Sequence, residues 1–323
     1  MDPTPCSQQS LDAGEPLYGS AAADIDHWLL LEHDGQWDKD AVASESLPEA
    51  VRAHARAWLE AAPRRRFQLV RDGRQTPLEW PRRLFLVDAR PGHARTLEVA
   101  LTGWEALAAL DLASLTETLR NASEPPDGVV VRAAPLVLVC THGRRDVCCA
   151  RLGVPVFREL ERDLARDNPG RVFQTTHLGG HRFAATMVLL PHGYTYGRLD
   201  VAAARRVVRG YFAGRLTDLD RLRGRSCYPA DVQAAEFWVR HNAGRYGLES
   251  LQLRRRDAEK GQTDVTFWDA ETDALHELSV VVDKTHDLAS SSCGDVPKPV
   301  SRHRIDSYRQ VHGATRDFDR DDF

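Results

Sequence analysis

The sequence predicts an α/β protein made of two similar modules in tandem, followed by a smaller C-terminal α+β segment. The length of 323 residues suits two domains, or one domain with a large appendage. Short apolar runs typical of strands alternate with helical patterns, and this order nearly repeats on either side of a turn-rich stretch, NASEPPDG, at 121–128. The repeat rests on the order of the elements and not on residue identity.

The first module is expected at residues 25–120, after a polar, turn-rich tail at residues 1–24 that we expect to be mobile. Ser46 and Pro48 mark the start of its first helix. The expected elements are a strand at 28–33, a helix at 46–62, strands at 67–70, 84–89 and 97–103, and a helix at 104–119.

The second module is expected at residues 121–224 and the C-terminal segment at residues 225–323. The second module repeats the order with a strand within 129–140, a helix at 150–165, strands at 171–177 and 182–191, and a helix at 201–214. The C-terminal segment is expected to hold a helix at 231–247 and short strands at 251–256, 264–269 and 277–283, and then a loop and an acidic tail.

Composition and net charge argue against some classes of function. Apolar residues make up 42% of the chain and charged residues 28%, which is a normal balance for a folded protein. The net charge of −4 offers no general attraction for nucleic acid or for an anionic membrane, so neither is expected as a partner. The sequence has no run of about eighteen apolar residues and no signal-peptide pattern at its start, so we expect a cytoplasmic protein.

Cysteine and histidine residues gather in the second module. The sequence CTHGRRDVCC occupies residues 140–149, and HLGGH follows at 177–181. Cys140 is expected to end a buried strand, and Cys148 and Cys149 to lie where a loop enters a helix. His177 and His181 would flank a Gly-Gly turn between two strands, where positive φ angles suit glycine. Because strand ends and their loops converge on one edge of an α/β sheet, these side chains can meet.

Thiolate and imidazole ligands together suit zinc or an iron–sulfur cluster, and exclude calcium and magnesium. Structural Cys2His2 zinc sites usually have ligand pairs two to four residues apart, whereas eight residues separate Cys140 from Cys149. A cluster is therefore favoured, and a zinc-binding interaction module is the alternative. A thiol-redox enzyme using Cys148 and Cys149 is weaker, because vicinal cysteines form strained disulfides and the chain has no CxxC motif.

The motifs CTHGRRDVCCARLG (140–153) and HLGGHRFA (177–184) resemble those of the sucrase/ferredoxin-like family of thioredoxin-like [2Fe–2S] ferredoxins. WLLLEH, YTYGRL and GRSCYP resemble that family's flanking motifs, so the resemblance covers roughly residues 15–300. It implies tandem thioredoxin-like modules, with a [2Fe–2S] cluster in the second module held by Cys140, Cys149, His177 and His181. Cys148 departs from the family's pattern and is the alternative to Cys149 as a ligand.

The resemblance also implies an electron carrier, or the redox subunit of a larger system, more than a stand-alone enzyme. Its partner would be a redox protein acting as donor or acceptor. Two ferric ions, two sulfides and two thiolates sum to zero charge, so the potential should exceed that of four-thiolate plant-type ferredoxins. Because a ligating imidazole can titrate, electron and proton uptake would be linked.

Other polar residues near the motifs have less specific interpretations. Asp146 is best read as a turn cap, and His142 could lie close to a ligand. Cys227 and Cys293 are expected to be buried structural cysteines more than a redox pair, and Cys6 in the tail is assigned no role. The absence of GxGxxG, Walker and GxSxG patterns gives no support for a nucleotide cofactor or a serine hydrolase. Three roles are open for the arginines beside the motifs: steering of an acidic partner, hydrogen bonds to cluster sulfur, or simple solvation. These arginines are Arg144, Arg145, Arg182 and Arg198.

Overall fold

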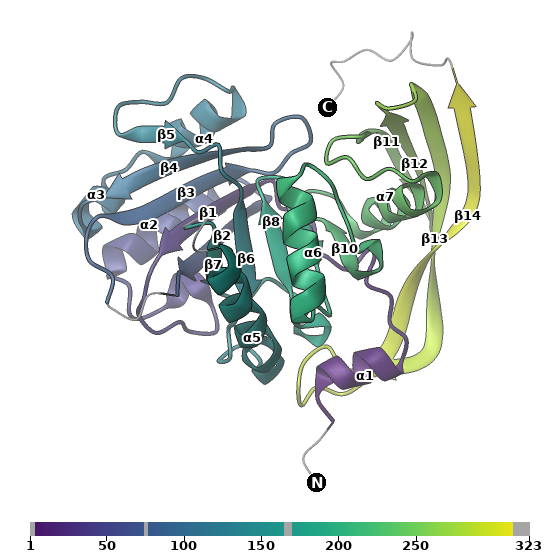
Figure 1. The fold of residues 1–323 in the computed structure, drawn as a ribbon, viewed down its shortest axis with the longest axis horizontal. Helices are drawn as coiled ribbons and strands as arrows, with labels where there is room; N and C mark the ends of the chain where they lie inside the picture. The colour runs from purple at the N-terminus through teal and green to yellow at the C-terminus, as the bar shows by residue number, and fades with distance from the viewer. Residues whose placement is uncertain (1–3, 74–76, 165–169, 313–323) are drawn as a thin grey trace.

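The computed structural model describes residues 4–73, 77–164 and 170–312, and Figure 1 shows how their elements are arranged. The helices and 3-10 turns are α1 (Cys6–Asp12), η1 (Ala41–Ala43), α2 (Glu49–Glu60), α3 (Trp104–Ala108), α4 (Leu112–Arg120), α5 (Val147–Leu164), η2 (His181–Phe183), α6 (Val201–Phe212), η3 (Leu219–Arg221) and α7 (Ala230–Ala243). The strands are β1 (His27–Glu32), β2 (Arg65–Arg71), β3 (Arg82–Asp88), β4 (Arg95–Leu101), β5 (Val129–Val131), β6 (Leu136–Cys140), β7 (Val172–Thr175), β8 (Met187–Leu190), β9 (Tyr194–Tyr196), β10 (Leu222–Arg225), β11 (Leu251–Glu259), β12 (Gln262–Asp269), β13 (Ala274–Ala289) and β14 (Lys298–His312).

The predicted α/β class is confirmed, and the two halves of the predicted repeat have the same strand topology. In the first half β1 pairs with β2 in parallel and with β3 antiparallel, and β4 lies beyond β3. In the second half β6 pairs in the same way with β7 and β8, and β9 lies beyond β8. The equivalent strands β2 and β7 pair antiparallel and join the halves into one sheet, ordered β10-β9-β8-β6-β7-β2-β1-β3-β4-β5 over the described residues.

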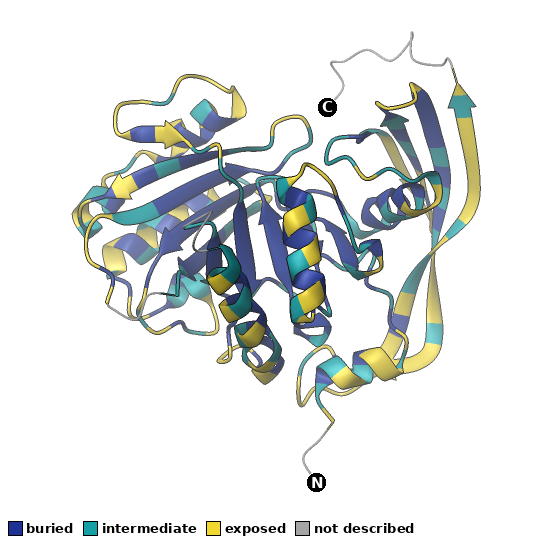
Figure 2. Cartoon of the chain, in the orientation of Figure 1, coloured by how far each residue is buried: buried dark blue, intermediate teal, exposed yellow. Residues whose placement is uncertain are grey.

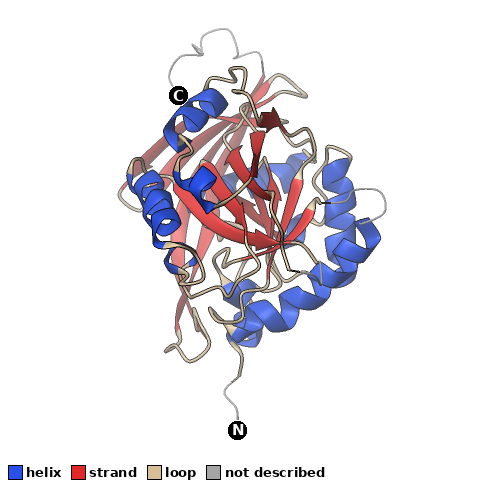
Figure 3. Ribbon diagram, turned by 90° about the vertical axis from the view of Figure 1, so that its left-hand side faces the viewer, coloured by secondary structure: helices blue, strands red, loops and turns tan. Residues whose placement is uncertain are grey.

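Helices cover the outside of this sheet (Figure 3). Helices α2 and α4 pack on alternate residues of the first half, including Leu29 and Leu31 of β1, and α5 and α6 pack likewise on Val137 and Val139 of β6. Figure 2 shows the strands buried beneath helices whose outer sides are exposed. The helix expected at 104–119 is two helices, because Asp111 accepts a hydrogen bond from the Ser114 N–H and caps α4.

The opposite face of the sheet carries a core shared by both halves, which includes Leu30, Phe85, Leu138 and Phe173. The rings of Phe85 on β3 and Phe173 on β7 have centroids 5.6 Å apart, although β1 and β2 lie between these strands. Three strand spacings would separate them by about 14 Å in a flat sheet. The sheet is therefore strongly curved, and Cys140 and Cys149 belong to the core inside the curve.

The strand that follows the turn-rich stretch at 121–128 completes the first half of the sheet. Strand β5 pairs antiparallel with β4, so the run expected as one strand within 129–140 divides into β5 and β6 around Pro135. The helix expected at 150–165 begins earlier, at Val147, and its expected last residue lies outside the described range.

The C-terminal segment is a second sheet of order β11-β12-β13-β14, with α7 packed on it through residues such as Val232 and Val239. The loop expected after 283 is wrong, because residues 298–312 form β14 along a 16-residue β13. Most side chains of β14 are exposed, so its sequence lacks the apolar alternation that marks a half-buried strand. The expected acidic tail at 313–323 lies outside the described residues.

Part of the expected N-terminal tail is helical. Helix α1 lies beside the far end of the β13–β14 hairpin (Figure 1), and Arg198 donates hydrogen bonds to the Ser10 hydroxyl and carbonyl oxygens. Arg182 forms an ion pair with Glu15 just after the helix. These contacts hold α1 against the second half, and the Cys6 side chain is fully buried. Over the described residues, no helix is both long and apolar enough to cross a membrane.

Candidate metal centre

Cys140 ends β6, and α5 begins seven residues later on top of it. Gly153 makes this close packing possible, because a Cβ atom at that position would lie 2.0 Å from the carbonyl oxygen of Cys140. The first turn of α5 thereby places Cys149 next to Cys140. Both predicted positions, the strand end and the start of the helix, are confirmed.

The histidine motif reaches the same point by crossing over the end of β6. Strands β7 and β8 were expected to follow each other around a turn, but they lie on opposite sides of β6 and are not neighbours. The segment between them therefore passes the end of β6, where Cys140 lies. Gly179 and Gly180 have φ angles of +92° and +67°, which confirms the predicted use of glycine in this loop.

Three of the four predicted ligands come together. One ligand atom each from Cys140, Cys149 and His177 lie within 4.8 Å of one another, and Cys149 Sγ is 3.8 Å from His177 Nδ1. His181 is outside this group, but its ring centroid lies 4.9 Å from that of His177. The two thiols thus lie side by side, and the two imidazoles lie side by side.

His181 is buried without the hydrogen bonds that a buried imidazole normally makes. It is 8% exposed, and neither ring nitrogen has a hydrogen-bond partner among the described residues. The nearest carboxylate oxygen, Asp146 Oδ2, is 3.7 Å from Nε2. Burial lowers the pKa of His181, which favours the neutral form of the imidazole. A ring nitrogen in this state suits a metal ligand, and the residues present fit a metal group.

The two buried thiols lie close together and shift each other's pKa in opposite directions. The neighbouring Cys149 lowers the pKa of Cys140, and the neighbouring Cys140 raises the pKa of Cys149. Arg66, which is half-buried, lies near Cys140, and desolvation lowers the pKa of its guanidinium to about 10. The contact between the two thiols thus favours ionisation of Cys140 over ionisation of Cys149.

The first half of the sheet supplies one wall of the site. Arg66 and Gln68 of β2 both donate hydrogen bonds to the carbonyl oxygen of His177. The backbone N–H of His177 donates to Nδ1 of His142 over 3.2 Å, and the edge of Trp37 packs against His142 with centroids 5.9 Å apart. His142 thus lies close to a candidate ligand, as expected, and positions its backbone.

The remaining residues singled out in the sequence have ordinary partners or lie elsewhere. Arg144 pairs with Asp38, and Asp146 accepts from the Cys148 N–H over 2.9 Å as a turn cap. Cys227 lies in the core under α7, away from Cys293, so these two cysteines do not form a pair. Arg182 and Arg198 hold the α1 segment in place, as described above.

Cys148 does not join Cys140. Its sulfur lies 3.7 Å from that of Cys6 and 3.5 Å from that of Cys293. This second group of thiols was not predicted, because its members are more than 140 residues apart in the sequence and no spacing motif links them.

A cleft of about 550 Å³ opens beside His177 between the two halves. Of the four predicted cluster ligands, His177 is the one that lines this cleft. Its charged lining residues are Lys39, Arg64, Arg65, Arg66 and Arg145, against Asp24 and Asp40. The cleft therefore carries an excess of positive charge.

A family model described as sucrase/ferredoxin-like matches residues 17–224, which include both motifs and both halves of the large sheet. The chain belongs to the sucrase/ferredoxin-like family. The expected resemblance is thereby confirmed for most of the chain.

Two curated relatives are both called altered inheritance of mitochondria protein 32. The protein from Meyerozyma guilliermondii is 39% identical over 70 residues, which is 20% of this chain and 25% of that protein. The protein from Clavispora lusitaniae is 32% identical over 78 residues, which is 23% of this chain and 29% of that protein. The chain thus spans 25% to 29% of the length of these relatives.

Among solved structures, the Cys59Ser variant of the thioredoxin-like [2Fe–2S] ferredoxin from Aquifex aeolicus matches 27% of this chain and 96% of its own. The identity is 17% and the TM-score is 0.24.

Proposed function

We propose that this sucrase/ferredoxin-like protein is an electron-transfer protein whose [2Fe–2S] cluster is held by Cys140, Cys149, His177 and His181. The observation that carries the proposal is the meeting of two buried thiols with His177, next to which lies the buried His181, whose ring nitrogens both lack hydrogen-bond partners among the described residues. When bound, such a cluster takes up and releases one electron. The two thiols lie side by side and the two imidazoles lie side by side, so each pair could bind one metal ion of a group that contains two.

The chain's own residues supply position and shielding. Gly153 lets α5 carry Cys149 up to Cys140, while Arg66, Gln68 and His142 hold the backbone of His177. The thiols and His181 are buried, whereas His177 is half-buried and lines the cleft. His177 is therefore the point at which electrons would enter and leave. The linked uptake of a proton remains a prediction from imidazole chemistry.

The positive cleft supports a partner of a particular kind. A redox protein that presents acidic side chains would be attracted to this cleft and brought within reach of His177. Docking of such a redox protein is the interaction expected of an electron carrier or of a redox subunit. Electron transfer to a docked protein needs no catalytic site for a separate substrate.

The fold proposed for the two halves is thioredoxin-like. Each half has a strand, a helix and three further strands in which the first strand pairs in parallel with the second and antiparallel with the third. The first half holds Glu32 at the strand-end position that Cys140 occupies in the second, and Glu32 is paired with Arg83. The proposed cluster therefore belongs to the second half.

Metal and sulfide analysis of anaerobically purified protein tests the proposal, together with absorption and electron paramagnetic resonance spectra. The expected result is about two iron and about two acid-labile sulfide per chain, with a coloured oxidised form and a paramagnetic reduced form. A colourless protein with zinc bound to the same four residues would replace this proposal with a zinc-binding interaction module.

A further inference from the structure

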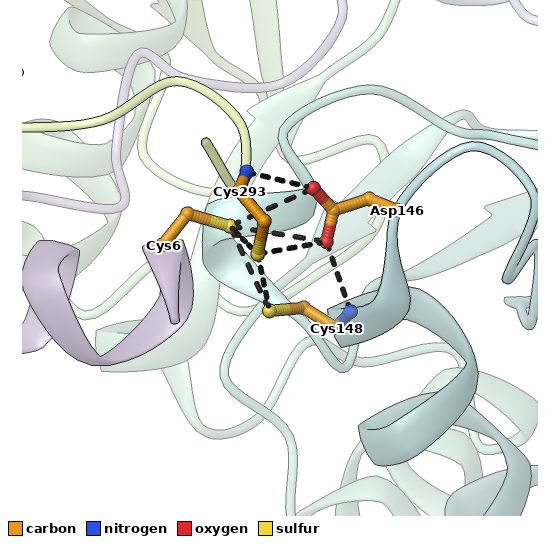
Figure 4. Close-up of side chains that lie close together, drawn as sticks. All are labelled: Cys6, Asp146, Cys148 and Cys293. Carbon is orange, nitrogen blue, oxygen red and sulfur yellow. Dashed lines mark hydrogen bonds between the residues drawn. The ribbon is translucent and has the colours of Figure 1, made fainter. Parts of the chain in front are cut away.

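Three cysteines from distant parts of the chain meet beside the proposed cluster site (Figure 4). Cys6 lies on α1, Cys148 in the first turn of α5, and Cys293 in the loop between β13 and β14. Their sulfur atoms form a triangle with sides of 3.7 Å for Cys6–Cys148, 3.5 Å for Cys148–Cys293 and 3.5 Å for Cys293–Cys6. None of the three is in a disulfide.

The carboxylate of Asp146 completes this group. Its Oδ1 lies 3.4 Å from the sulfur of Cys293 and 3.9 Å from that of Cys6. One ligand atom from each of the four residues lies within 4.8 Å of every other. Cys6, Cys148 and Asp146 are buried, and only Cys293 is exposed among the four.

These distances match the edges of a tetrahedral zinc site. With Zn–S bonds of about 2.3 Å and a Zn–O bond of about 2.0 Å, the edges would be about 3.8 Å between sulfurs and about 3.5 Å between sulfur and oxygen. The observed edges are 3.5 to 3.7 Å and 3.4 to 3.9 Å. Three thiolates with one carboxylate also suit zinc by ligand type, and exclude calcium and magnesium.

Asp146 is held in place as metal-binding carboxylates usually are. Its oxygens accept from the backbone N–H of Cys148 over 2.9 Å, and from the N–H of Cys293 and the Ser292 hydroxyl over 3.0 Å each. Burial would raise the pKa of Asp146, but the N–H groups of Cys293 and Cys148 outweigh it and lower the pKa to about 2. These hydrogen bonds orient the carboxylate before any ion arrives.

The C-terminal hairpin reaches this point, where Arg302 of β14 also donates a hydrogen bond to the carbonyl oxygen of Ala13. Strands β13 and β14 leave their sheet as a long arm that ends beside α1 (Figure 1), and residues 282–284 and 286–288 of the arm are exposed. Cys293 and Ser292 at the tip contact Asp146. A bound ion would tie the N-terminal helix, the start of α5 and this arm together.

We propose that Cys6, Asp146, Cys148 and Cys293 form a second metal site, specific for zinc, that fastens α1 and the β13–β14 arm to the second half of the sheet. Zinc binds the thiolate form of cysteine, so binding at this site would be accompanied by loss of thiol protons. The site is separate from the proposed cluster, although Asp146 Oδ2 also lies 3.7 Å from Nε2 of His181.

Zinc and iron analysis of the full-length protein tests this inference with four variants. We expect about one zinc per chain in the wild type, and at least a tenfold loss of zinc in Cys6→Ser and Cys293→Ser. Cys227→Ala is the matched control, because Cys227 lies in another core, and it should keep its zinc. Asp146→Asn should bind zinc more weakly. X-ray absorption at the zinc edge should give three sulfurs at about 2.3 Å and one oxygen at about 2.0 Å.

Cys293→Ser decides the matter if Cys6→Ser fails to fold, because Cys293 is exposed and its change disturbs no core. Loss of zinc should also speed amide hydrogen exchange in residues 282–297. Four results would each overturn the inference. Two concern zinc: it stays in both serine variants, or the wild type takes up none on dialysis. The other two are a Cys6–Cys293 disulfide and extra iron that is lost in Cys293→Ser. Iron retained in Cys293→Ser would separate this site from the proposed cluster, and iron absent from every form would contradict the cluster alone.

Discussion

Cys148 and Cys149 are consecutive residues of α5, but their sulfur atoms lie in two different groups of side chains. Successive residues of an α-helix point about 100° apart. Cys149 therefore faces Cys140 and His177, while Cys148 faces Cys6 and Cys293. One dipeptide thus serves two sites.

This divergence predicts opposite results for two matched variants. Cys149→Ser should lose iron and sulfide, because it removes one of the two thiols beside the imidazoles. Cys148→Ser should keep the full iron content, because its sulfur is directed elsewhere. Iron and sulfide analysis of both purified proteins measures this, and cluster loss in Cys148→Ser with retention in Cys149→Ser would reverse the ligand assignment.

A second prediction concerns the contact between α5 and β6. Gly153→Ala places a methyl group 2.0 Å from the carbonyl oxygen of Cys140, so the helix or the strand end must move. We expect a loss of about 1–3 kcal/mol in the free energy of unfolding and a lower iron content. Arg151→Ala is the control, because Arg151 is exposed on the same helix. Equal stability and iron content in the two variants would show that the close approach is unimportant.

A third prediction concerns the charge of the cleft. The measured quantity is the ratio of two rates, the oxidation of the reduced protein by anionic ferricyanide and its oxidation by cationic hexaamminecobalt(III). If electrons leave at the positive cleft, this ratio should be higher than expected for a protein with a net charge of −4. The double variant Lys39→Glu/Arg145→Glu should lower this rate ratio several-fold at low salt, and the effect should fade as salt screens the charges. The double variant Lys260→Glu/Lys284→Glu, at exposed positions of the C-terminal segment that do not line the cleft, makes the same change in net charge and is the matched control. Equal ratios in both variants would exclude electron entry at the cleft.

The fourth prediction is a pH dependence of stability caused by His192. Burial, with help from nearby Arg225, lowers the pKa of His192 to about 4, while its Nδ1 shares a 2.7 Å hydrogen bond with Tyr211. The unfolded chain therefore binds this proton at a higher pH than the folded protein does. The contribution to stability is complete above about pH 6.5 and is lost as the pH falls toward 4, by up to about 3 kcal/mol.

Denaturant unfolding at several pH values measures this effect. His192→Gln should flatten the slope between pH 6.5 and pH 4 by up to one proton. His33, whose pKa burial also lowers to about 4, keeps its own share of the slope in that variant. An unchanged slope in His192→Gln would mean that the pKa of His192 is the same in the folded protein as in the unfolded chain, and would contradict the prediction.

The sequence predicted the parts of the protein that local patterns encode. The strands β1 and β6 are apolar runs, and Cys140, Cys149 and His177 belong to short motifs next to strand ends, so their meeting followed from the topology of an α/β sheet. The relation of the histidine loop to β6 was not predicted, because strand order in a sheet is not visible in local spacing.

The group formed by Cys6, Cys148 and Cys293 was not predicted, for a different reason. Cys6 lies in a polar stretch and Cys293 in a serine-rich loop, and each gains its meaning only from a contact more than 140 residues away. Strand β14 was missed because pairing with β13, and not burial of an apolar face, is what holds it. Non-local contacts therefore account for what the sequence left out.

Ligation by two imidazoles is the central claim, and pulsed electron paramagnetic resonance of the reduced protein tests it most directly. Protein grown with ¹⁵N-labelled histidine should show strong couplings to two histidine nitrogens, and their spectra should change on replacement of ¹⁴N by ¹⁵N. His177→Cys and His181→Cys should each remove one coupling and keep a cluster. A reduced [2Fe–2S] signal with no strongly coupled histidine nitrogen would contradict the account.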